Sequence, residues 1–185
     1  MTSFYTEEEI IKIGFKSVGN NVKISRKASL YSSEKMQIGD NVRIDDFCLL
    51  SGKIVLGNNI HIAAYSAIYG GEDGVFIEDY SNISSRVTIY SISDDYSGNT
   101  MTNPTIPDEY KHIHSSPVVI KRHCIIGSTS VILPGTVLEE GSAFGAFSFI
   151  RENSEPWSVN VGIPSHKIAN RSRQLLELEK KYNLN

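Results

Sequence analysis

The residues with the most evident chemistry lie in a polar segment that covers residues 90–116. It contains two adjacent carboxylates, Asp94 and Asp95, and two histidines, His112 and His114. Imidazoles and carboxylates are the side chains that most often move protons in enzymes, and several imidazoles together can bind zinc. An aspartate pair in a loop can also shape a turn by accepting backbone hydrogen bonds. The segment therefore predicts either a catalytic base or a structural turn at Asp94 and Asp95.

This segment interrupts a six-residue repeat of large apolar side chains. A period of six fits neither a helix nor simple strand alternation, but it fits a parallel β-helix in which each of three short faces contributes one inward side chain per turn. A β-sandwich is the alternative, and it has no reason to keep a six-residue register. Small residues that often follow the inward position are expected to let the backbone turn each corner. The repeat positions are Ile38, Ile44, Leu50, Leu56, Ile62, Ile68, Ile77, Ile83, Ile89, Ile120, Ile126, Ile132, Leu138, Phe144 and Ile150.

The repeat divides the 185 residues into parts of one predicted domain, which is dominated by β-structure. Residues 1–20 form an N-terminal cap with a short helix between Thr6 and Gly14, which have the residue types of a helix N-cap and a helix end. Coils cover 21–89 and 117–152, and 90–116 is a long excursion loop. The tail, 153–185, follows the end of the regular coils at Pro156 and Trp157, and it contains a predicted helix from Asn170 to Tyr182.

Composition excludes several classes of protein. A net charge of −3 gives no support for a nucleic-acid partner. No apolar run approaches the length of a membrane span, and no signal peptide is evident at the N-terminus. The two cysteines, Cys48 and Cys124, fall two residues before inward positions, which predicts buried thiols and no disulfide framework. These features predict a cytoplasmic protein.

The six-residue repeat, the long loop and the tail GIPSHKI after a proline–tryptophan pair carry a resemblance over nearly the whole chain. The sequence resembles the hexapeptide-repeat acyltransferases, and within them the maltose/galactoside O-acetyltransferase-like group from polysaccharide and O-antigen biosynthesis. The resemblance implies a left-handed parallel β-helix, acetyl-CoA as the acyl donor, and a homotrimer with active sites between adjacent subunits. The handedness comes from the resemblance, because the periodicity does not indicate it.

The resemblance also implies where the base lies. Such enzymes have a histidine near the start of the loop, in a pattern like YTATHP, where this chain has YSISDD. Asp94 stands at that position, with Asp95 beside it, and a carboxylate is a weaker base than imidazole unless burial raises its pKa. His123, at the coil corner where the loop returns, could act as the base or pair with Asp94. An amine acceptor would need less help from a base, so transfer to oxygen and to nitrogen both stay open.

The acceptor and the cofactor are assigned to other corners of the coil. His61 directly precedes the inward Ile62, so it should point outwards and, with Tyr65, could line an acceptor groove. By position in the family, the small residues Ser128, Gly145 and Ala146 would lie along the pantetheine arm of CoA. Lys167 and Arg171 would contact the CoA phosphates. No metal is required, and neither cysteine is placed as a nucleophile, which predicts direct attack without an acyl-enzyme.

The sequence therefore predicts an acetyl-CoA-dependent acetyltransferase that acts on a hydroxyl or amino group of a sugar or nucleotide sugar in surface polysaccharide biosynthesis. Two alternatives belong to other classes. A γ-class carbonic anhydrase has the same coil pattern, and His61, His112, His114 and His123 could supply zinc ligands. A non-catalytic β-helix scaffold is the other, since an aspartate stands where the family has its histidine.

Overall fold

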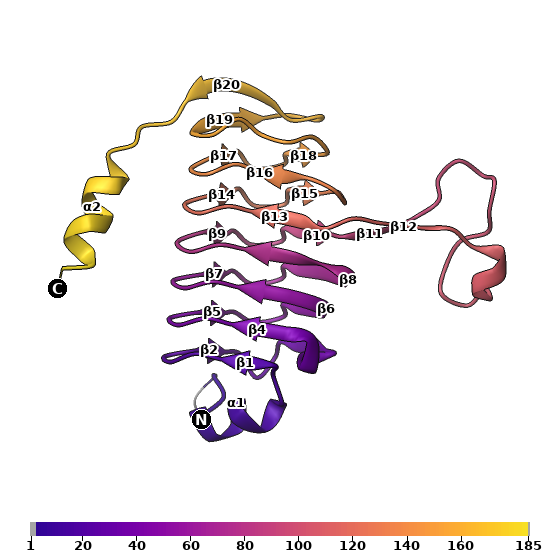
Figure 1. Cartoon of the computed structure of the whole chain (residues 1–185), viewed down its shortest axis with the longest axis horizontal. Helices are drawn as coiled ribbons and strands as arrows, with labels where there is room; N and C mark the ends of the chain where they lie inside the picture. The colour runs from indigo at the N-terminus through magenta and orange to yellow at the C-terminus, as the bar shows by residue number, and fades with distance from the viewer. Residues whose placement is uncertain (1–2, 185) are drawn as a thin grey trace.

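The computed structural model describes residues 3–184, and most of them form a β-helix of about seven turns. Its coils stack along one axis, with an arm (residues 91–116) on one side and the C-terminal helix on the opposite side (Figure 1). The fold is a left-handed parallel β-helix, as expected. All fifteen repeat positions are buried, and none of their side chains is more than 4% exposed. The six-residue register is thus the register of the core.

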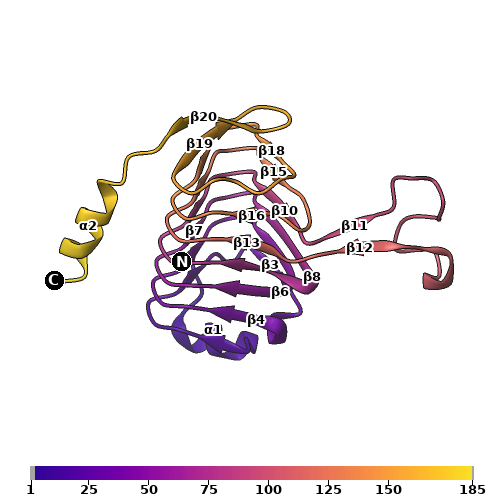
Figure 2. The same cartoon turned by 45° about the horizontal axis from the view of Figure 1, so that its top comes forward.

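Three faces make up each coil, and the strands of each face pair in parallel with the coils above and below (Figure 2). Strands β6 (Leu49–Leu56) and β8 (Ala67–Ile77) are long enough to continue from the first face to the second. The first face also contains β3 (Ser29–Tyr31), β10 (Thr88–Tyr90), β15 (Val131–Ile132) and β18 (Phe149–Ile150). The second contains β1 (Ser17–Val18), β4 (Met36–Ile38), β13 (Val118–Ile120) and β16 (Val137–Leu138). The third contains β2 (Lys23–Ile24), β5 (Arg43–Ile44), β7 (His61–Ile62), β9 (Asn82–Ile83), β14 (Ile125–Ile126), β17 (Ala143–Phe144) and β19 (Ser158–Val161).

The N-terminal helix α1 (Glu7–Ile13) closes the open end of the stack, as predicted. Thr6 caps it: the Thr6 side chain accepts from the Glu9 amide, and the Glu9 side chain accepts from the Thr6 amide. Gly14 ends the helix with a φ of 80°, a conformation that costs glycine least. Ile10 is 3% exposed and belongs to the core of the β-helix, so α1 covers apolar side chains that the first coil would leave in water.

The glycines after the inward positions have a different role from the predicted one. The left-handed conformation at the corners falls two residues later, on residues such as Tyr65, Arg86 and His123, whose φ angles are 65°, 61° and 61°. A Cβ at Gly127 would overlap the backbone nitrogen of Ala146 on the next coil. These glycines are therefore needed for the close stacking of successive coils, and the positive φ is taken by larger side chains.

The tail differs from the prediction in two places. Strand β19 follows Trp157 and pairs in parallel with β17, so the coils continue beyond the proline–tryptophan pair. Asn170, where the predicted helix was to begin, is instead the last residue of β20 (His166–Asn170), which pairs antiparallel with β19. The helix α2 covers only Leu175–Tyr182. The backbone of β20 pairs with β19 because β19 would otherwise leave an unpaired edge. This pairing takes precedence over the helical pattern in the sequence.

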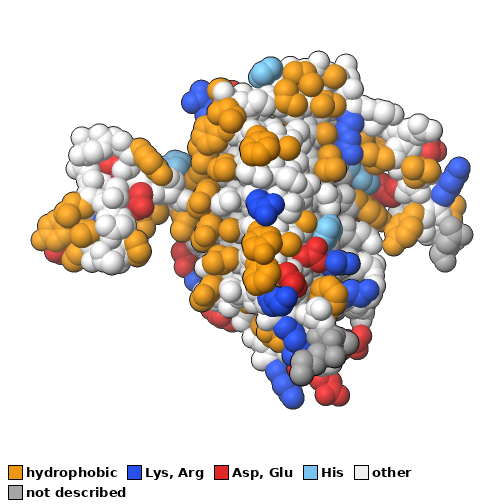
Figure 3. Space-filling view, turned by 180° about the vertical axis from the view of Figure 1, so that it is seen from behind, with side chains coloured by type: hydrophobic (Ala, Val, Ile, Leu, Met, Phe, Trp, Pro, Cys, Tyr) orange, Lys and Arg blue, Asp and Glu red, His pale blue; other side chains and the backbone are white. Residues whose placement is uncertain are grey.

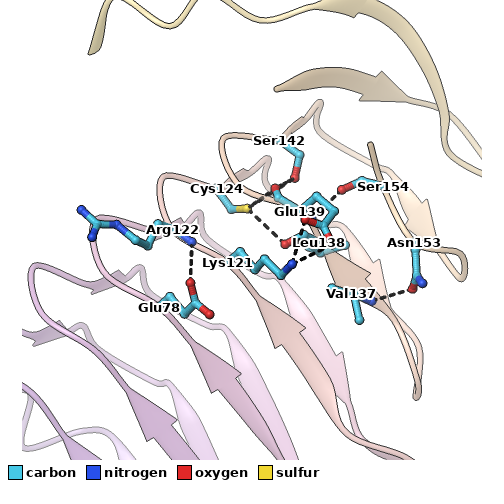
Figure 4. A network of polar contacts seen from close by, with 10 residues as sticks. All are labelled: Glu78, Lys121, Arg122, Cys124, Val137, Leu138, Glu139, Ser142, Asn153 and Ser154. Atoms are coloured by element: carbon cyan, nitrogen blue, oxygen red, sulfur yellow. Dashed lines mark hydrogen bonds and ion pairs between the residues drawn. The ribbon is translucent and has the colours of Figure 1, made fainter. Parts of the chain in front are cut away.

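Side chains complete the last turn of the second face. Among residues 3–184, no strand pairs with the outer edge of β16. The amides of Val137 and Glu139 donate instead to Asn153 Oδ1 and Ser154 Oγ, both at 2.8 Å (Figure 4). Lys121 adds an ion pair with both oxygens of Glu139, at 2.8 Å each. The backbone groups at this edge are thus satisfied without another coil, as buried amides require.

The two thiols are buried as predicted, and we expect them to be unreactive. Cys48 and Cys124 are each 1% exposed, and Cys124 Sγ contacts Glu139 O at 3.2 Å and Ser142 Oγ at 3.3 Å (Figure 4). Burial raises the pKa of each thiol to about 11. Because the thiolate is the nucleophile, a disulfide reagent at pH 8 should modify neither cysteine in the native protein and both after denaturation. Rapid modification of the native protein would contradict this packing.

Candidate functional site

The arm carries Asp94 to the edge of a large cavity. Strands β11 (Ile92–Asp94) and β12 (Ile113–Ser115) pair antiparallel, with Asp94 opposite Ile113, and a 3-10 turn (Asp108–Tyr110) lies further out. Asp94 is exposed and lines a cavity of about 820 Å³ between the arm and the first face of the coils. The cavity walls are mainly apolar and aromatic, and they include Tyr69, Tyr90, Val131, Leu133 and Phe149.

Asp95, in contrast, has the contacts of a turn-forming residue. Its carboxylate accepts hydrogen bonds from Ser97 N at 2.8 Å, Ser97 Oγ at 2.9 Å and Thr100 Oγ1 at 2.9 Å. The bonds from the backbone and side chain of Ser97, followed by that from Thr100, lower the pKa of Asp95 to about 2. A carboxylate with so low a pKa is a poor proton acceptor near neutral pH. The structure therefore favours the structural interpretation of Asp95.

His123 lies on a different side of the molecule from the arm. Its Nε2 is 2.8 Å from Glu179 Oε2 on α2, and its ring stacks on Tyr80 with the ring centroids 5.2 Å apart. It is 6% exposed. The arm and α2 project from opposite sides of the coils (Figure 1), so one chain does not bring His123 and Asp94 together. His123 has the contacts of a residue that holds α2 against the coil.

The predicted acceptor residues lie on the third face and at its corner. His61 points outwards, with Nε2 2.9 Å from Asp45 Oδ2 and Nδ1 3.0 Å from Asn82 Oδ1. Tyr65 lies at the corner that follows, 54% exposed, with its ring stacked on Phe47 at a centroid distance of 4.9 Å. We name this edge the aromatic corner. It is the stack of turns that carry Phe47, Tyr65, Arg86, Thr129 and Phe147, all with positive φ.

Three of the predicted cofactor residues gather at the aromatic corner, and two do not. Ser128 accepts a hydrogen bond from Phe147 N at 2.9 Å, which places it beside Gly145 and Ala146 on the next coil. Lys167 instead pairs with Glu155 at 2.6 Å. Arg171 donates to the carbonyls of His123 at 2.7 Å and Gly141 at 2.9 Å, and burial lowers its pKa. Arg171 is thus largely occupied in joining the tail to the coil beside α2.

A metal site and a membrane-spanning helix are both absent from residues 3–184. Among residues 3–184, no three His, Cys, Asp or Glu side chains lie close enough together to hold a metal ion. The histidines of the zinc alternative are dispersed: His61 is on the third face, His123 is under α2, and His112 and His114 are in the arm. Neither helix within the same range is both long and apolar enough to span a bilayer.

The β-helix fold is shared with known acetyltransferases. A galactoside acetyltransferase in complex with coenzyme A has the same fold, with a TM-score of 0.59 and 22% identity over 90% of this chain and 70% of that one. No protein-family model matches the sequence. Individual proteins, in contrast, resemble this chain much more closely than the shared fold alone would require.

A dTDP-4-amino-4,6-dideoxy-D-glucose acyltransferase of Escherichia coli is 53% identical over 180 residues, which are 96% of this chain and 93% of the relative. AntD, an N-acyltransferase from Bacillus cereus, superposes with a TM-score of 0.96 and 50% identity over 98% of both chains, in a complex with dTDP-4-amino-4,6-dideoxyglucose and coenzyme A. Another AntD structure holds dTDP and 3-hydroxybutyryl-CoA. The chain therefore belongs to the family of dTDP-amino sugar acyltransferases. It is an acyltransferase, which replaces the scaffold and carbonic anhydrase alternatives.

Ser84 was not singled out from the sequence, and its residue number also occurs among the AntD variants. AntD structures include variants named D94A, D94N and S84A, and this chain has an aspartate at 94 and a serine at 84. Ser84 directly follows the inward Ile83, in a turn that belongs to the aromatic corner, and its amide donates to Ile126 O at 3.0 Å. A serine at a coil corner has no distinguishing signal in a single sequence, because serines occur at many corners of this chain.

Proposed function

We propose that this enzyme transfers an acyl group from an acyl-CoA to the amino group of a dTDP-linked 4-amino-4,6-dideoxy sugar. The observation that carries the proposal is the near-complete superposition on AntD, in a complex that contains coenzyme A and that nucleotide amino sugar. The similarly named Escherichia coli relative supports the same substrate class. Of the two acceptors that the sequence left open, nitrogen is thus the one supported.

The reaction needs little covalent chemistry from the protein. The amine must first be in its neutral form, because an ammonium has no electron pair with which to attack. Its nitrogen then attacks the thioester carbonyl carbon, a C–N bond forms, the C–S bond breaks, and CoA leaves as the thiolate, which takes up a proton. A general base that receives the nitrogen's proton contributes roughly 10²- to 10⁴-fold in rate.

Asp94 is the residue that we assign to this proton transfer. Its carboxylate lies at the rim of the cavity, on a strand of the arm that is fixed by pairing with β12. Unlike Asp95, whose oxygens accept three hydrogen bonds, Asp94 has its carboxylate exposed. AntD structures include the variants D94A and D94N, and position 94 of this chain is also an aspartate. This agreement supports the assignment.

We also propose a homotrimer in which each site is shared between two chains. Ser84, Ser128 and Ala146 lie at the aromatic corner, before the first face, whereas Asp94 lies beyond the far end of β10. Five or six extended residues separate the two edges, a distance on the order of 15 Å. One amino group cannot reach both edges of a single chain, so a neighbouring copy would supply the second edge.

The cavity is larger than an acetyl group needs. Its volume of about 820 Å³ and its apolar walls support acyl groups larger than acetyl, in keeping with the 3-hydroxybutyryl-CoA bound by AntD. A location in the cytoplasm and a role in surface polysaccharide biosynthesis stay predictions from the sequence.

The decisive experiment is a transfer assay with dTDP-4-amino-4,6-dideoxyglucose and either acetyl-CoA or 3-hydroxybutyryl-CoA. We expect release of free CoA thiol together with an N-acylated nucleotide sugar, identified by mass spectrometry. The matched control is the 4-hydroxy nucleotide sugar, which should not be acylated. Absence of product from the amino sugar with both donors would overturn the proposal, and light scattering on the same sample tests the trimer.

A further inference from the structure

A column of two stacked aromatic rings with a cation at each end runs along the N-terminal half of the aromatic corner. Lys27 Nζ lies 5.2 Å from the centroid of the Phe47 ring, Phe47 stacks on Tyr65, and Arg86 Cζ lies 5.4 Å from the centroid of the Tyr65 ring. This corner faces the viewer in the space-filling view from behind, where hydrophobic and basic side chains follow one another down the middle (Figure 3). Phe47, Tyr65 and Arg86 each have a positive φ at their turn, and their side chains stack in this column.

Arg86 differs from the other cations of this region because its charge is not balanced. Lys27 pairs with Asp46 at 3.0 Å, and Arg43 pairs with Asp45 at 2.7 Å. The exposed guanidinium of Arg86 forms no ion pair with any carboxylate of residues 3–184, and it lies over the ring of Tyr65. Stacking on that ring fixes the plane of the guanidinium while its N–H groups stay free to bind an anion.

The position of Arg86 along the corner indicates which anion that is. The residues that we assign to the pantetheine arm, Ser128 and Ala146, lie on turns towards the C-terminus from Ser84. The acyl group would then meet the amine near Ser84, and the rest of the acceptor must extend the other way. Three further turns are available in that direction, about 14 Å at the spacing of neighbouring strands. Arg86 is two residues from Ser84. A diphosphate attached to the sugar would begin near Arg86.

We propose that Arg86 binds the diphosphate of the nucleotide-sugar acceptor and that Tyr65 holds its guanidinium in the orientation for bidentate contact. This inference rests on the proposed function, since it assumes that the acceptor is a nucleoside diphosphate sugar. Arginine suits the role because its planar fork of donors matches phosphate oxygens in pairs. Asp94 is an anion, which a diphosphate repels, and the Ser84 hydroxyl offers a single uncharged donor in place of a bidentate fork.

The test compares R86Q and R86K with a control, R151Q. Arg151 is also exposed and lies at the far edge of the first face, where it is 3.6 Å from Glu152. Binding of dTDP and of CoA to each variant is measured by calorimetry, and KM for the amino sugar is measured by CoA release. We expect R86Q to weaken dTDP binding and to raise this KM by roughly 10- to 100-fold, as lost charge-assisted contacts do. R86K should lie in between, because it keeps the charge without the fork.

Three results would separate this inference from its alternatives. An R86Q variant that binds dTDP within twofold of wild type overturns it. So does an R86Q variant that dissociates into monomers in light scattering, because the partner of Arg86 would then be a carboxylate of a neighbouring chain. If wild type binds dTDP and R86Q does not, Arg86 is supported even when no acyl transfer is detected, and only the proposed reaction fails. CoA binding and the melting temperature should be unchanged in all variants.

Discussion

Replacing Asp94 by Asn is expected to lower kcat by roughly 100- to 1000-fold while the melting temperature stays within a degree or two of wild type. The amide has nearly the same shape as the carboxylate but cannot accept a proton from the attacking amine. Asp94 is exposed, and its pairing with Ile113 is through the backbone, which the substitution retains. KM for acyl-CoA should change little, because the carboxylate is assigned to proton transfer and not to cofactor binding.

Glu109→Gln is the matched control for this prediction. Glu109 belongs to the same arm, in the 3-10 turn Asp108–Tyr110, and is exposed. The described lining of the cavity does not include it, so E109Q should retain wild-type kcat. A D94N enzyme with wild-type turnover would remove Asp94 from the base role. His123→Asn would then be the next variant to assay, although that histidine is tied to Glu179.

The fold was predictable because the β-helix repeats one local rule many times. Every sixth residue must be large and apolar to fill a narrow core, so Ile38 to Ile150 identify the coils without any knowledge of long-range contacts. The arm was predictable as a break in that rule. The tail was not predictable in the same way. The strand β20 forms because the edge of β19 lies beside it, and its own sequence pattern does not determine it.

The candidate site was only partly predictable, since it depends on which corner each residue occupies. Asp94 was found through the family's motif, and Ser128, Gly145 and Ala146 do share one corner. Arg171 was assigned to phosphate, but its guanidinium serves two backbone carbonyls. Arg86 had no signal in the sequence, because an unbalanced charge becomes visible only when the neighbouring coils show which cations already have partners.

A pair of adjacent isoleucines in β14 provides the largest expected effect on stability. Ile126 points inwards and is 0% exposed, whereas Ile125 points outwards and is 37% exposed. Ile126→Ala should lower the free energy of unfolding by about 2–5 kcal/mol, because it removes buried methyl groups and leaves a cavity between tightly stacked coils. Ile125→Ala, with the same chemical change in the same strand, should cost less than about 1 kcal/mol, since much of its surface is already in water.

The comparison is made by chemical denaturation of both variants, with oligomeric state checked at each protein concentration. Trimer dissociation would make the midpoint depend on concentration, so the two variants must be compared at one concentration. Equal losses would show that the outward face at Ile125 is buried by a neighbouring chain. That result would place the third face in the interface between subunits. A much larger loss for Ile126 shows that the inward series, and not contact between chains, provides the stability that positions Ser128 on this coil and Ser84 on the coil before it.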